Sequence, residues 1–67
     1  MEMRPRYRTR NVIMKDICRH ELDKMPKTLD KAELVRRITA VKEVLDGKSD
    51  RELVAAAEFR GIGVYQF

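Results

Sequence analysis

The chain has 67 residues, a length that favours one small domain or one subunit of an oligomer. Lysine and arginine outnumber the acidic residues by 15 to 11, and 43% of the residues are apolar, which argues against a disordered chain. One cysteine excludes an internal disulfide, and one cysteine with one histidine cannot complete a four-ligand zinc site within one chain. We therefore expect no catalytic residues, no metal and no cofactor, because so short a chain has little core to spare for an enzyme pocket. No apolar segment reaches bilayer-spanning length, so we expect no membrane contact and a cytoplasmic location.

Most of the net charge of +4 lies in the first ten residues, which hold four arginines against one glutamate. The arginines alternate, and Pro5 disfavours a helix, so an extended arm would present all four on one face. Such an arm is a candidate for contacts with DNA phosphates or the minor groove, through Arg4, Arg6, Arg8 and Arg10. An acidic protein partner and a solvated, disordered terminus are the alternatives.

A first helix is expected from roughly Val12 to Lys24, with Asn11 as its N-cap and Pro26 after its end. Apolar residues recur along it at helical spacing, namely Met14, Ile17, Cys18, Leu22 and Met25. Cys18 and His20 would point to different sides of this helix, which disfavours a shared metal ion. We expect Cys18 in the core and His20 at the surface.

A second helix is expected to begin after Thr28 or Asp30, with Glu33 completing a capping box with Asp30, and to stop at Gly47. Its apolar residues recur at spacings of four, three and four, as in a coiled coil, and form a seam of Leu34, Ile38, Val41 and Leu45. Val35 and Val44 widen this stripe. Because the core is small, the seam is a candidate interface of a homodimer.

Ser49 and Glu52 have the spacing of a capping box, which predicts a third helix that Gly61 terminates. The Gly-x-Ser-x-Arg-Glu-Leu stretch and the apolar spacing after it, over residues 47–64, resemble the first helix of a bacterial helix-turn-helix DNA-binding unit. Val54 and Glu58 stand where the family usually has alanine and glycine. The same residues are also typical of the capped start of an ordinary bundle helix.

The resemblance implies a second, DNA-reading helix that begins near Arg60 and holds Tyr65 and Gln66 on or near it. Lys48, Arg51 and Arg60, near the third helix, are candidates for secondary DNA contacts beside the N-terminal arginines.

The last six residues are rich in large apolar side chains and read as a short strand or a packed tail. Either these side chains pack on the helices or they form a partner interface, through Ile62, Val64, Tyr65 and Phe67. If the tail is strand-like, we expect it to pair with the N-terminal arm in a two-stranded ribbon.

The sequence therefore predicts a mainly α, three-helix domain over residues 11–61, with a basic arm at 1–10 and an apolar tail at 62–67. The leading interpretation is a small non-enzymatic DNA-binding or transcription-regulatory protein, of a size and charge common in phages and mobile elements. The alternative is a protein-interaction module, an inhibitor or adaptor that docks on a larger complex through its helix stripe and apolar tail.

Overall fold

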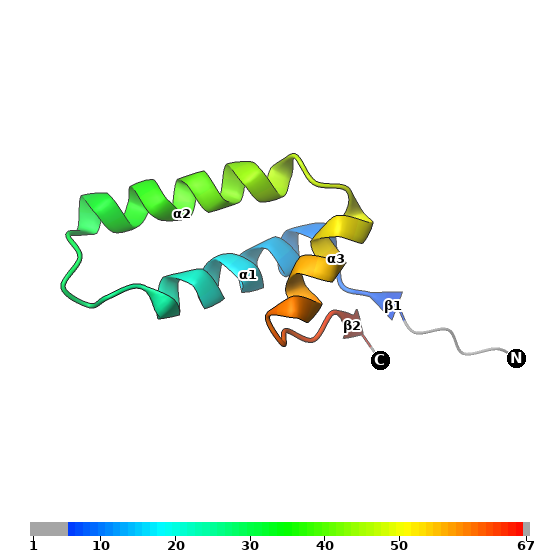
Figure 1. Ribbon diagram of the computed structural model, residues 1–67. Coiled ribbons are helices and arrows are strands. Elements are labelled where there is room, and N and C mark those ends of the chain that lie inside the picture. The colour runs from blue at the N-terminus through cyan, green and yellow to red at the C-terminus, as the bar shows by residue number, and fades with distance from the viewer. Residues whose placement is uncertain (1–5, 67) are drawn as a thin grey trace, which may run out of the picture.

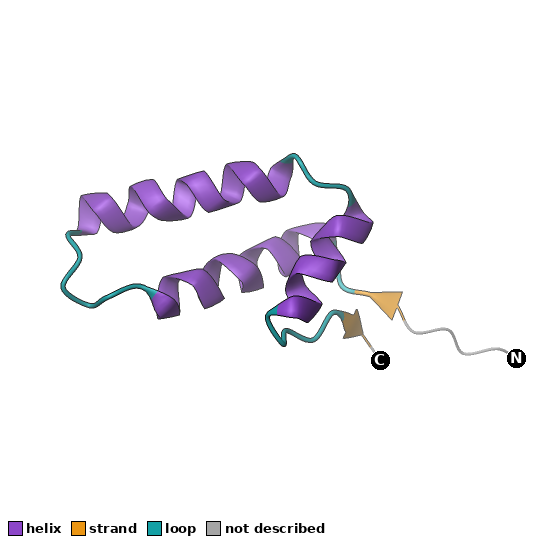
Figure 2. Cartoon of the chain, viewed as in Figure 1, coloured by secondary structure: helices purple, strands orange, loops and turns teal. Residues whose placement is uncertain are grey.

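The computed structural model describes residues 6–66, and three helices make up most of that span (Figure 2). The elements follow in the order β1 (Arg6–Tyr7), α1 (Arg10–Lys24), α2 (Lys31–Asp46), α3 (Asp50–Phe59) and β2 (Tyr65–Gln66). Helices α1 and α2 run antiparallel as a hairpin, and α3 crosses α1 near its N-terminal end (Figure 1). The mainly α, three-helix fold is confirmed. Arg4 and Phe67, both named as candidate site residues, lie outside the described residues.

Helix α1 begins two residues earlier than expected, so the assignment of Asn11 as N-cap is wrong. Thr9 is the N-cap, because its backbone is extended (φ −62°, ψ 151°) and its side chain accepts a hydrogen bond from the Val12 N–H. Arg10 therefore lies in the first turn of α1 and not in an extended arm. The C-terminal end agrees with the prediction, since α1 stops at Lys24, ahead of Pro26.

Helix α2 begins after Asp30, but the expected capping box is absent. The Asp30 side chain makes no cap hydrogen bond. Glu33 instead forms ion pairs with Arg36 at 3.4 Å and Arg37 at 3.3 Å, on its own helix. Gly47 ends the helix as expected, yet in an ordinary right-handed conformation (φ −81°).

Helix α3 opens with the predicted capping box, because the Ser49 hydroxyl accepts from the Glu52 N–H while the Glu52 carboxylate accepts from the Ser49 N–H. It ends in a Schellman motif: Gly61 has φ 73° and donates its N–H to the carbonyl of Glu58, and Ile62 donates to that of Ala57. This motif reverses the chain direction. The second helix that the resemblance places near Arg60 therefore does not form.

The two chain ends pair as an antiparallel ribbon, which confirms the expected pairing of arm and tail. Arg6 lies opposite Gln66 and Tyr7 opposite Tyr65, and the two tyrosine ring centroids are 4.9 Å apart. The Arg8 N–H continues the pairing by donating to the Val64 carbonyl at 2.8 Å.

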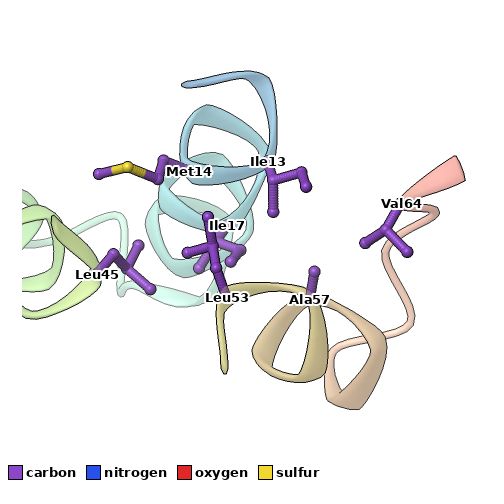
Figure 3. Packing of buried hydrophobic residues seen from close by; sticks show 7 residues of the cluster. All are labelled: Ile13, Met14, Ile17, Leu45, Leu53, Ala57 and Val64. Carbon is purple, nitrogen blue, oxygen red and sulfur yellow. The ribbon is translucent and has the colours of Figure 1, made fainter. Parts of the chain in front are cut away.

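The core lies where α3 crosses α1, at one end of the hairpin (Figure 3). Its buried side chains come from all three helices and the tail: Ile13, Met14, Ile17, Leu45, Leu53, Ala57 and Val64. Cys18 packs against this cluster as expected. One expectation is wrong, because His20 is half-buried rather than at the surface. Phe59, at the end of α3, is 90% exposed and does not join the core.

Candidate functional site

A basic groove of about 330 Å³ opens beside the ribbon, between β1, the start of α1 and the first turns of α3. It combines three guanidinium groups and one carboxylate with a tyrosine and three aliphatic side chains: Tyr7, Arg8, Arg10, Ile13, Asp50, Arg51, Leu53 and Val54. Ile13 and Leu53 are buried core residues that lie beneath the groove, and the half-buried Val54 supplies the accessible aliphatic part of its floor. Tyr7 and Arg51 are exposed and lie at its rim.

Arg8 is held against α1 by its own chain. Its Nη1 donates to Oδ2 of Asp16 at 2.7 Å, and its backbone is tied to Val64 of the tail. Because backbone and side chain are both bonded, the guanidinium has a fixed position at the groove.

Arg10 is the most extensively bonded arginine of the described chain. Its Nη1 donates to Oδ1 of Asp50 at 2.9 Å, and its Nη2 donates to the carbonyl oxygens of Leu45 at 3.0 Å, Asp46 at 3.0 Å and Lys48 at 2.6 Å. These carbonyls lie at the C-terminal end of α2, where helix carbonyls lack intrahelical partners and a positive charge is favourable. Arg10 therefore joins α1, α2 and α3.

Arg6 and Arg51 are exposed and form no ion pair with another residue in the 6–66 span. Arg51 lies in the first turn of α3 and lines the groove, and Arg6 lies in β1, next to Tyr7. These two arginines retain side-chain donors for a ligand.

Arg60 lies outside the basic groove. It donates from Nε to Oε1 of Glu21 at 2.8 Å and from Nη1 to the Ala56 carbonyl at 2.9 Å. The hydrogen bond from Arg60 lowers the pKa of the Glu21 carboxyl below its ordinary value of 4.5. Arg60 and Lys48 border a different groove, between α2 and α3. The basic residues predicted from the sequence are thus divided between two grooves, with Arg8, Arg10 and Arg51 at the first and Lys48 and Arg60 at the second.

Several residues predicted to form an interface belong to the fold itself. Val64 and Leu45 are buried in the core, and Ile62 packs against it, because the Schellman turn directs the tail back over α3. Tyr65 stays partly exposed, beside Tyr7. The rest of the predicted dimer seam is half-buried: Leu34, Ile38 and Val41.

Sequence reasoning found the arginines but missed the apolar floor of the groove. Leu53 and Val54 come from α3 and Ile13 from α1, and only the crossing of these helices brings them to the ribbon. The early start of α1, set by Thr9, is the one local feature that would have indicated that Arg10 belongs to the helix and not to the extended arm.

Residues 6–66 contain no group of three or more histidine, cysteine, aspartate or glutamate side chains arranged to hold a metal ion. Burial raises the pKa of the Cys18 thiol, which is the opposite of what a reactive cysteine requires.

The three described helices are too short or too polar to cross a membrane. Comparisons of the chain with family models, with curated proteins and with solved structures found no match, so the groove is interpreted from its own geometry.

Proposed function

We propose that the protein is a small non-enzymatic interaction module whose basic groove binds an acidic, partly apolar segment of another protein. The observation that carries this proposal is the placement of three guanidinium groups around an apolar floor, with only one carboxylate among the lining side chains.

The groove offers complementary contacts to two kinds of side chain. Val54 is the part-exposed aliphatic side chain of the groove, above the buried Ile13 and Leu53, and suits an aliphatic or aromatic side chain, while Arg51 can bind a carboxylate through two parallel N–H donors. Arg8 and Arg10 are already held by internal hydrogen bonds, so little side-chain entropy is lost when a ligand binds beside them. A segment that alternates acidic and apolar residues satisfies both features.

DNA binding is the second candidate, and the exposure of Arg6 and Arg51 at one end of the molecule favours it. Arg8 and Arg10 use their donors on Asp16, Asp50 and main-chain carbonyls, so a phosphate and a peptide carboxylate both have to compete with these acceptors. DNA is placed second because a DNA backbone would leave the apolar part of the groove without a complementary contact.

The test uses the 15N-labelled full chain and two probes, an acidic peptide that alternates aspartate with leucine and phenylalanine, and a short DNA duplex. We expect the peptide to shift the amide resonances of Tyr7, Ile13 and Leu53, and Arg51→Glu to weaken binding by roughly tenfold, which is about 1.4 kcal/mol. Arg19→Glu is the matched control, since Arg19 is an exposed arginine that does not line the groove.

A second peptide, in which serine replaces the apolar residues, separates the contribution of charge to binding from the contribution of apolar contacts. It should bind less well if the apolar floor takes part. Duplex binding that is tighter than peptide binding at physiological salt, and that falls steeply as salt rises, would favour the DNA candidate. Peptide-induced shifts spread evenly over the molecule would contradict a groove.

A further inference from the structure

Strand β1 has an open edge, since the sheet formed by the described residues contains β1 and β2 alone. Tyr7 lies opposite Tyr65, and the Arg8 N–H donates to the Val64 carbonyl at 2.8 Å. In an antiparallel ladder, residues that bond across the pair alternate with residues whose N–H and C=O point the other way. The main-chain N–H and carbonyl of Tyr7 therefore point away from β2, and no hydrogen bond within residues 6–66 uses them.

The basic groove runs along this open edge. Tyr7 and Arg8 both line it, whereas Val64 and Tyr65, their neighbours across the ribbon, do not. Successive residues of a strand point to opposite faces, so a groove on one face of the ribbon would contact only one of Tyr7 and Arg8. Contact with both indicates that the groove follows the edge of β1, where the Tyr7 main chain is unpaired.

We infer that the acidic, partly apolar segment binds in the basic groove as an extended strand, which adds to the open edge of β1 through hydrogen bonds with the main chain of Tyr7. The inference rests on the proposed function and specifies the conformation of its ligand. Strand addition suits this site because main-chain bonds supply affinity, while the side chains beside the edge select the ligand's sequence. A helical ligand does not bind in this way, since its own N–H and carbonyl groups are bonded within the helix.

The side chains along the open edge specify which ligand residues pair well with it. Opposite charges, and pairs that involve an aromatic ring, stabilise neighbouring strands. An apolar ligand residue opposite Tyr7 packs beside the tyrosine ring, which is 56% exposed. Its neighbour lies opposite Arg6, whose guanidinium forms no ion pair in the described chain, so a carboxylate is favoured there. Arg8 contributes less, since its Nη1 already donates to Asp16.

A second copy of the chain is a poor occupant of the same edge. Two β1 strands paired antiparallel about Tyr7 would place Arg6 of each copy opposite Arg8 of the other. Like charges directly opposite each other destabilise a strand pair. The charge of the edge therefore favours an acidic partner over self-association.

Backbone N-methylation of the peptide that alternates aspartate with leucine and phenylalanine tests the inference. A methyl group removes the amide donor, and the amides of alternate residues in an extended strand point to opposite edges. Methylation of one alternate set should therefore weaken binding to the full chain by roughly tenfold or more, and methylation of the other set should have little effect. Strand direction decides whether the sensitive set is the apolar residues or the aspartates. The two peptides share charge and side chains, so each is the matched control for the other.

Amide hydrogen exchange of the 15N-labelled full chain locates the pairing. The Tyr7 N–H forms no hydrogen bond within residues 6–66, so saturating peptide should slow its exchange by about tenfold or more. The Arg8 N–H is the internal comparison, because it already donates to Val64 and gains no new bond. Arg6→Glu should weaken peptide binding severalfold, while Arg19→Glu, at an exposed arginine outside the groove, should not.

The outcomes separate this inference from the function on which it rests. Peptide-induced shifts at the groove, with both methylated peptides bound equally and Tyr7 exchange unchanged, would overturn strand addition and leave the proposed function standing. Absence of peptide binding would overturn both. Slower Tyr7 exchange at high protein concentration without peptide would show that a second copy covers the edge, which also overturns the inference.

Discussion

Arg10 and Asp50 join the first residue of α1 to the first residue of α3, with Nη1 of the arginine 2.9 Å from Oδ1 of the aspartate. The same guanidinium donates to three carbonyls around the end of α2. This side chain of α1 thus bonds to the end of α2 and the start of α3, and it stabilises the bundle where the three helix ends meet beside the basic groove.

Replacing Arg10 should destabilise the whole fold. Arg10→Ala leaves the carbonyls of Leu45, Asp46 and Lys48 without this donor, and we expect a loss of about 2 kcal/mol in the free energy of unfolding. Urea denaturation followed by circular dichroism measures it. Asp50→Asn is the control and should cost much less, because the Asp50 side chain is 84% exposed and the carbonyl bonds remain. Equal losses in the two variants would show that the carbonyl contacts contribute little.

The ion pair between Arg60 and Glu21 should make stability depend on pH in the acidic range. The hydrogen bond from Arg60 lowers the pKa of Glu21, so the folded state favours the ionised carboxylate. The contribution of the ionised Glu21 to folding stability is therefore complete above the ordinary pKa of 4.5, and it is lost as the pH falls through the lower, folded-state pKa. Arg60→Gln should reduce stability at neutral pH by up to about 1 kcal/mol and by much less at pH values below the folded-state pKa. Thermal unfolding of Arg60→Gln across this pH range measures the effect. Arg36→Gln, at an exposed ion pair, is the control.

Gly61 and Gly47 both follow helices, but only Gly61 should be difficult to replace. Gly61 has φ 73°, where a side chain is strained, so Gly61→Ala should cost about 1 kcal/mol. Gly47 has φ −81°, and a Cβ there would lie 3.7 Å from the nearest carbonyl oxygen, an ordinary contact. Gly47→Ala should therefore be neutral or slightly stabilising. A larger loss in Gly47→Ala than in Gly61→Ala would contradict the Schellman assignment.

The two predicted capping boxes should behave differently on mutation. Ser49→Ala removes an observed hydrogen bond to the Glu52 N–H and should cost about 1 kcal/mol of stability. Asp30→Ala removes a side chain that makes no cap hydrogen bond, so its cost should be a few tenths of a kcal/mol from the helix dipole alone. Chemical denaturation of both variants under the same conditions makes the comparison. Similar losses would indicate that Asp30 caps α2 in solution.

Local patterns predicted the elements well wherever the determinants lie within a few residues of each other. The spacing of Ser49 and Glu52 predicted the start of α3, and Gly61 its end, because capping bonds and positive φ depend on neighbours in the chain. The alternating residues at both ends predicted the ribbon, since strand pairing leaves a period-two pattern. The error at Asn11 is also local, because Thr9, another residue that favours the N-cap, lies two residues earlier.

The sequence by itself determined three helices, both ends of α3 and a concentration of positive charge at the N-terminal end. Only the tertiary structure decided which arginines bond to the protein itself, because Arg10 meets Asp50 and the end of α2 across more than thirty residues of chain. Charge along a sequence records how many cations are present, and says nothing of the carboxylates and carbonyls that folding brings beside them. The same holds for α2, whose apolar seam was visible in the sequence, while its packing against α1 decided which side of that helix was covered and which remained exposed.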